Sequence, residues 1–160
     1  AVARGLWKRR SVEWVLIFFI ILGVVGTLGY QLRKVQGQAE FATVQYTLGS
    51  LRTAMILEHL RLKLHPEEKP RLRNPFELLE VMPYNLEGER AMTDAHTVAP
   101  GSWFFDPFCE CIAYRMQHAE RLDEPAGSEI LAFRIRFNPN EGLMWLEPLF
   151  PMAWMGMRIG

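Results

Sequence analysis

The residues that could do chemistry are few, and the most suggestive are two cysteines that flank one glutamate, Cys109 and Cys111. Outside the cytoplasm, an oxidising environment favours a disulfide between them. A bridge across a single residue closes a small, strained ring, and such bonds tend to be redox-labile. A metal site would need two further ligands, and His118 is the nearest candidate. The pair therefore predicts a disulfide or two free thiols rather than a metal site.

No other group of residues has the spacing of a catalytic site. The histidines are scattered and form no H-x-x-x-H pair, and the chain has no G-x-S-x-G, phosphate loop or nucleotide fingerprint. Its formal net charge is zero, which argues against a nucleic-acid partner. We therefore expect no enzyme activity, cofactor, metal or small-molecule substrate. The remaining enzymatic alternative is a membrane-tethered redox protein that uses Cys109 and Cys111.

Residues 12–32, VEWVLIFFIILGVVGTLGYQL, predict a transmembrane helix, because about twenty apolar residues cross a hydrocarbon core of roughly 30 Å. A signal peptide would have a shorter apolar run and a small-residue cleavage site, which is missing here. A buried helix of a soluble protein is the alternative. More basic residues precede the span than follow it, which predicts a cytoplasmic N-terminus and a domain outside. The basic residues before it are Arg4, Lys8, Arg9 and Arg10, and those after it are Arg33 and Lys34.

The span also predicts a docking surface for another helix. Gly23, Gly26 and Gly29 recur every three residues on nearly one side, and small residues let helices approach closely in lipid. Glu13, at the cytoplasmic end, would pair with a basic residue of a neighbour or with Arg9 or Arg10. Because glycine is common in membrane helices, a simple tether is the alternative.

Residues 33–64 predict an amphipathic continuation of this helix. Five apolar residues step by three and four, which is typical of a helix laid on a core; they are Phe41, Val44, Leu48, Leu51 and Met55. A coiled-coil seam is the alternative.

Residues 65–101 predict a loop that contains a short helix, 75–82, with Asn74 as its N-cap and Pro75 at its first position.

Residues 102–146 predict three or four short strands separated by turns, which favours an antiparallel meander. The apolar face of that sheet needs a cover, and the stripe on the long helix supplies one. The expected fold is therefore α+β, with one long N-terminal helix packed on a three- to four-stranded antiparallel sheet.

Residues 147–160 form an apolar tail, which packs on its own domain or binds a partner. Its Met and Trp content favours a partner that contacts Phe150, Trp154 and Met155.

This layout resembles that of type IV pilins and of the type II secretion pseudopilins. The segments NPFELLEVMPYNLEGE (74–89) and PGSWFFDPFCECIAYR (100–115) are similar to segments of pilin-like proteins involved in biogenesis of the mannose-sensitive haemagglutinin (MSHA) pilus. The chain departs from the family in its leader, residues 1–11. A prepilin has Gly-Phe at the cleavage site and Glu at the fifth mature position, whereas here Gly5-Leu6 is the nearest candidate and Glu13 follows later. We therefore expect the leader to be retained.

The resemblance implies a non-enzymatic, single-pass subunit of a bacterial inner membrane with a periplasmic head. It would act in the assembly of a type IV pilus or a type II secretion-like machine, with the lipid bilayer and other membrane subunits as partners. The alternative is an accessory or scaffold subunit of another bacterial membrane complex, docked through its transmembrane helix and its head.

Overall fold

The computed structural model describes residues 2–69, 74–124, 128–154 and 156–159. The chain divides into two units, residues 1–39 and residues 40–160. The described residues of the first unit are all helical, and the second unit contains the strands. Each unit is described by itself below.

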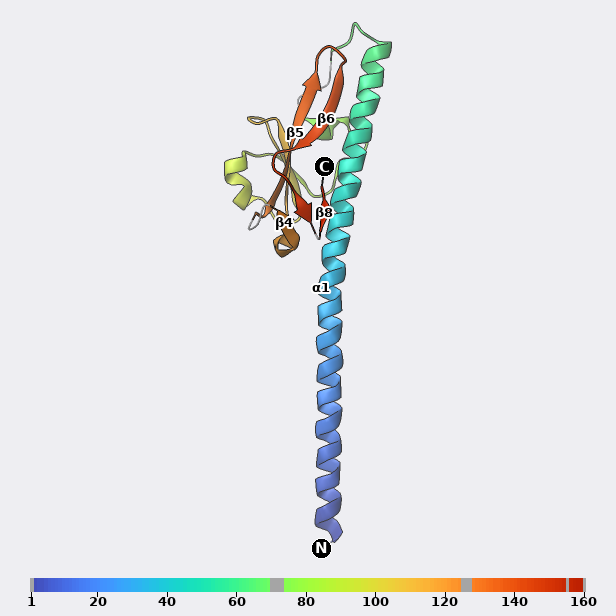
Figure 1. Ribbon diagram of the computed structural model, residues 1–160, viewed down its shortest axis with the longest axis vertical. Coiled ribbons are helices and arrows are strands. Elements are labelled where there is room, and N and C mark those ends of the chain that lie inside the picture. The colour runs from blue at the N-terminus through green and yellow to red at the C-terminus, as the bar shows by residue number, and fades with distance from the viewer. Residues whose placement is uncertain (1, 70–73, 125–127, 155, 160) are drawn as a thin grey trace. The chain divides into compact units, whose positions relative to one another are not determined.

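A single helix, α1 (Val2–Leu64), begins in the first unit and ends in the second (Figure 1). In the first unit its apolar side chains from Val12 to Val35 are exposed. This helix, near the N-terminus, is long and apolar enough to cross a membrane. Exposed apolar residues on every side are what a helix in lipid requires, since lipid rather than protein surrounds it.

In the second unit α1 is amphipathic and lies along one face of the sheet (Figure 1). Val44, Leu48, Leu51 and Met55 are fully buried in the main core, and Phe41 packs at its edge. The predicted stripe is therefore confirmed as the face that covers the sheet. The alternative of a coiled-coil seam is wrong, because these side chains contact their own domain.

The main sheet has five strands in the order β1-β2-β3-β5-β6. They are β1 (Leu86–Glu89), β2 (Ser102–Asp106), β3 (Cys111–Arg115), β5 (Ile130–Asn138) and β6 (Leu143–Pro148). The pairs β2–β3, β3–β5 and β5–β6 are antiparallel, as the turns predict.

The expectation of a purely antiparallel sheet is wrong, because β1 pairs parallel with β2. This strand lies in residues expected to be loop. The chain between the two strands passes through the 3-10 helix η2 (Met92–Thr97), so that it enters β2 in the same direction as β1. The Trp103 N–H donates to the carbonyl of Asn85 at 2.9 Å, which fixes the start of the pairing.

A second, three-stranded antiparallel sheet is formed by β4 (Leu122–Glu124), β7 (Ala153–Trp154) and β8 (Met157–Arg158). The short 3-10 helix η3 (Ala119–Arg121) leads into β4. The residues of β7 and β8 belong to the predicted tail, which therefore folds onto its own domain.

Each face of the main sheet has its own apolar cluster. Toward α1, the core contains Trp103, Phe105, Ile112 and Phe133, together with Phe76 from the 3-10 helix η1 (Pro75–Leu78). On the far face, a smaller cluster is covered by η2 and comprises Ala95, Val98, Phe104, Ala113 and Ala132. The alternation of side chains along each strand separates the two clusters.

Helix η1 is shorter than the predicted helix 75–82. Its N-cap is Asn74, as predicted, and the Asn74 side chain accepts a hydrogen bond from the Phe76 N–H at 3.1 Å. The helix ends because Leu79 is extended.

Candidate functional site

The predicted docking residues of the anchor are exposed. A Cβ added at Gly23, Gly26 or Gly29 would meet nothing within 4 Å, so a larger side chain would fit at each of them. Thr27 beside them donates its hydroxyl to the Gly23 and Val24 carbonyls at 3.0 and 2.9 Å. The hydroxyl is thus satisfied within the helix, as lipid requires. Glu13 is exposed as well.

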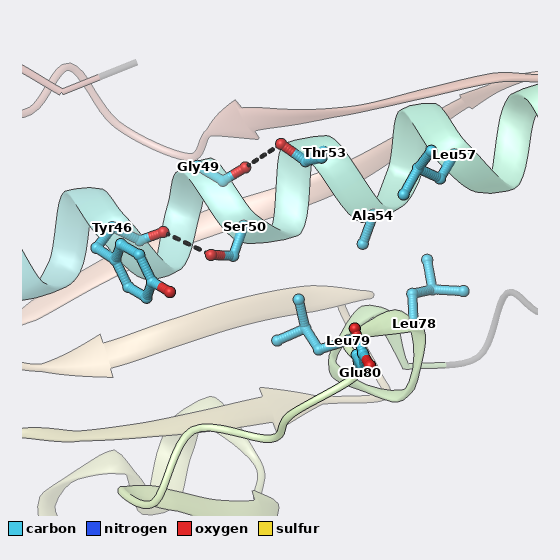
Figure 2. Close-up of a pocket in the computed structure, with 9 residues that line it drawn as sticks. All are labelled: Tyr46, Gly49, Ser50, Thr53, Ala54, Leu57, Leu78, Leu79 and Glu80. Carbon is cyan, nitrogen blue, oxygen red and sulfur yellow. Dashed lines mark hydrogen bonds between the residues drawn. The ribbon is translucent and has the colours of Figure 1, made fainter.

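The second unit, residues 40–160, is called the head below. A groove that the sequence did not predict runs along the part of α1 that lies in the head (Figure 2). One wall is the exposed face of the helix, and the other is the end of η1 with the segment that follows it. Its volume is about 560 Å³, and its lining residues are Tyr46, Gly49, Ser50, Thr53, Ala54, Leu57, Leu78, Leu79 and Glu80. A second hollow of about 320 Å³ shares Tyr46, Ser50 and Leu79 and continues toward Asn85.

The groove offers apolar surface and no reactive group. Ser50 donates its hydroxyl to the Tyr46 carbonyl and Thr53 donates its own to the Gly49 carbonyl, each at 3.0 Å, as the dashed lines in Figure 2 show. Tyr46 is 77% exposed. The sequence does carry a signal for an exposed apolar surface on this helix. Three apolar residues lie off the buried stripe, namely Tyr46, Ile56 and Leu57. This surface suits binding rather than catalysis.

A buried carboxylate at the start of the head is the most connected polar group, and the sequence reading missed it. Glu40 of α1 accepts hydrogen bonds from the Tyr114 hydroxyl at 3.0 Å and from the backbone N–H groups of Gln117 and His118 at 2.6 and 3.0 Å. His118 Nδ1 lies 2.7 Å from the same carboxylate. Burial, followed by the negative charge of Glu40, raises the pKa of Tyr114.

This cluster is a structural clamp. It joins the helix to the residues that follow β3 and satisfies every oxygen of the carboxylate. Its residues do not line either of the two hollows described above. His118, considered above as a possible metal ligand, therefore has a structural role. In the described part of the chain, no group of three or more His, Cys, Asp or Glu residues is placed to hold a metal ion.

Cys109 and Cys111 are joined by a disulfide in the turn between β2 and β3. Cys111 is fully buried, Cys109 is partly exposed, and Glu110 between them has a positive φ of 53°. The side chain of Asp106 supports the turn by accepting from the Phe108 N–H at 2.8 Å and from the Met92 N–H at 2.7 Å.

The predicted partner-binding tail has to be corrected at Trp154. Its side chain is 0% exposed and packs edge-on against Phe41 with ring centroids 5.3 Å apart. It is therefore part of the core and is not available to a partner, because the apolar stripe of α1 needs this cover. Phe150 is exposed, as a partner site requires. Met155 lies outside the described residues.

The two segments that carry the resemblance to pilin-like proteins are in contact. Asn85 donates its amide to the Gly101 carbonyl at 2.6 Å, and the rings of Phe76 and Trp103 are 5.9 Å apart. Arg115 donates to the His96 and Val98 carbonyls at 2.7 and 2.5 Å, which ties η2 to the sheet. These residues hold the head together and do not form a reactive site.

No protein-family model, no curated protein and no solved structure matches this chain. Its relation to the pilins therefore stays a prediction from the residues.

Proposed function

We propose that this protein is a pilin-like, non-enzymatic subunit of a bacterial inner membrane, anchored by the first part of α1 and carrying a periplasmic head. It acts in the assembly of a type IV pilus or a type II secretion-like machine. The observation that carries the proposal is the division of one helix into an exposed apolar part and an amphipathic part that covers a sheet. The excess of basic residues before the span supports the orientation.

The contacts within the head support the same proposal. The two segments that resemble pilin-like proteins form one bonded unit around β1, β2 and η1. The exposed groove beside Tyr46 supplies surface for a neighbouring subunit. The alternative function, an accessory subunit of a different membrane complex, uses the same anchor and the same groove, and it differs only in the partner.

Photo-crosslinking in cells tests this proposal. A benzophenone amino acid is placed at Gly26 in the anchor, at Tyr46 in the groove, and at Asn140 in an exposed turn as the control. We expect crosslinks from Gly26 and Tyr46 to pilins or pseudopilins, and far fewer from Asn140. Crosslinks to the subunits of an unrelated membrane complex would favour the alternative function. Recovery of the protein in the soluble fraction after an alkaline carbonate wash would refute both.

A further inference from the structure

The Cys109–Cys111 disulfide is a reactive group that the proposed assembly role does not use. We propose that it is a thiol–disulfide exchange site. The thiolate of a protein dithiol attacks the Cys109 sulfur, and the Cys111 sulfur is the leaving group. The proposal stands apart from the pilin-like function, because it depends only on the head.

The turn that carries the disulfide is held by bonds that do not involve sulfur. Asp106 accepts from two backbone N–H groups, those of Met92 and Phe108. On the other side of the turn, the Ile135 N–H donates to the Glu110 carbonyl at 3.0 Å. The bridge spans a single residue, so it removes little freedom from the unfolded chain. Its opening should therefore leave the fold intact.

The two sulfurs differ in access. Cys111 is 0% exposed in the first position of β3, whereas Cys109 is partly exposed in the turn. Phe108 beside it is 86% exposed and offers an apolar contact to an approaching protein. An attacking thiolate must reach one of the two sulfurs, and of the two residues Cys109 is the more exposed.

The residue of the leaving sulfur is paired with an arginine on the neighbouring strand. Cys111 is directly opposite Arg134 of β5 in the antiparallel register, so the two side chains share one face of the sheet. A neighbouring positive charge stabilises a thiolate. Two carboxylates also lie on this face, Asp106 opposite Cys111 and Glu147 opposite Arg134. Asp106 accepts the two N–H groups described above, and Glu147 is bound by Arg136 at 2.6 Å.

The exchange balances in two steps. The first partner thiolate forms a bond to Cys109 Sγ, the bond between the two protein sulfurs breaks, and its electron pair leaves on Cys111, which takes a proton from water. The second partner thiol, after losing its proton to water, attacks the partner sulfur of this mixed disulfide and releases Cys109 as a thiolate, which takes a proton from water. The partner dithiol is oxidised to a disulfide by two electrons, and the Cys109–Cys111 pair is reduced to two thiols.

The first test uses the full chain in detergent micelles, with dithiothreitol as the dithiol. Alkylation by iodoacetamide and intact mass count the thiols, while circular dichroism follows the fold. We expect reduction at millimolar dithiol, a melting curve that does not change, and reoxidation by oxidised glutathione. Three results would overturn the proposal: reduction only where the protein unfolds, purification with two thiols that oxidised glutathione does not join, or reduction that oxidised glutathione does not reverse.

The second test asks which sulfur is attacked. In Cys111→Ser, the free thiol of Cys109 should react with an aromatic disulfide reagent at least tenfold faster than the thiol of Cys111 does in Cys109→Ser. Equal rates, or a faster Cys111, would overturn the proposed direction. If either variant fails to fold, peptide mapping of the mixed disulfide trapped on the parent protein answers the same question, with Cys109 as the expected position.

The third test examines the cation. Arg134→Gln should slow opening of the parent disulfide by dithiothreitol several-fold, whereas Arg158→Gln, the same charge change at an exposed position of β8, should not. Equal opening rates for the two variants would remove Arg134 from the proposal as a positioning residue. Circular dichroism of both variants provides the check that a rate change is not a loss of fold.

Discussion

The two faces of the main sheet are built differently, although the same strands supply both. The face toward α1 is continuous and largely aromatic, with Trp103, Phe105 and Phe133 under a helix. The far face has small residues at its centre, Ala113 and Ala132, in a cluster with residues of η2, and then polar residues toward the turn that carries the disulfide. Large apolar side chains are therefore concentrated on one face, while the other carries charged side chains, such as Arg136 and Glu147, that are about half exposed.

The largest loss of stability is expected for a substitution on the face of the sheet that α1 covers. Leu48→Asp places a charge where the side chain is fully buried, and burial of an unpaired charge should lower the free energy of unfolding by on the order of 4 kcal/mol or more. Urea denaturation followed by circular dichroism measures it. Thr53→Asp, at an exposed position of the same helix, is the control and should change little. If Leu48→Asp unfolds like the parent, the stripe does not cover the sheet.

A smaller loss of stability is expected for a substitution of Phe104, a fully buried residue of the far face. Phe104 is fully buried beneath η2, and Phe104→Ala should cost about 3 kcal/mol through lost apolar contact and a cavity. Phe108→Ala is a matched control, because it makes the same change on an exposed side chain. The same denaturation measurement applies. Similar losses for the two variants would mean that η2 does not cover the sheet.

The clamp at the edge of the helix-covered face gives a third prediction. Tyr114→Phe removes the hydroxyl that donates to Glu40, which should cost about 1–2 kcal/mol near neutral pH. Tyr46→Phe, at an exposed hydroxyl, should cost close to nothing.

Tyr114 should also make the stability of the protein depend on pH. Because folding raises the pKa of Tyr114, its contribution to stability is complete below the ordinary tyrosine pKa of about 10 and is lost as the pH rises above that value. The parent should therefore lose stability above pH 10 more steeply than Tyr114→Phe. Parallel pH profiles would show that folding does not raise the pKa of the Tyr114 hydroxyl.

The smallest effect is expected for a charge pair on the far face. Arg136 and Glu147 are bonded at 2.6 Å, but each side chain is about half exposed. Exposed pairs contribute roughly 0–1 kcal/mol, so Arg136→Ala should lower stability by less than Phe104→Ala does. A double-mutant cycle with Glu147→Ala measures the coupling, which added salt should weaken. A coupling as large as the loss in Phe104→Ala would contradict the comparison of the two faces.

The parts of the fold that the sequence predicted are those set by local pattern. The apolar run and the stripe from Phe41 to Met55 follow one helical period, and Asn74 with Pro75 marks the start of η1. The antiparallel strands alternate and are separated by turns. Each of these signals lies within a few residues of the element that it specifies.

The parts that the sequence did not predict depend on distant residues. The four residues of β1, Leu-Glu-Gly-Glu, have no strand alternation, and only pairing with β2 makes them a strand. Glu40 looks like an ordinary polar residue of a helix, because its donors lie 74 to 78 residues later in the chain. Trp154 was assigned to a partner surface for the same reason, since the ring of Phe41 that it contacts is far away in sequence.

The contact between Phe41 and Trp154 also constrains the order in which the molecule is made. The ribosome produces the helix first, yet the last cover of its apolar stripe is encoded close to 110 residues later. At about 5–20 residues per second, that interval lasts roughly 6 to 20 s. Throughout that interval Trp154 cannot cover the stripe, so the growing chain carries exposed apolar surface of the kind that promotes aggregation.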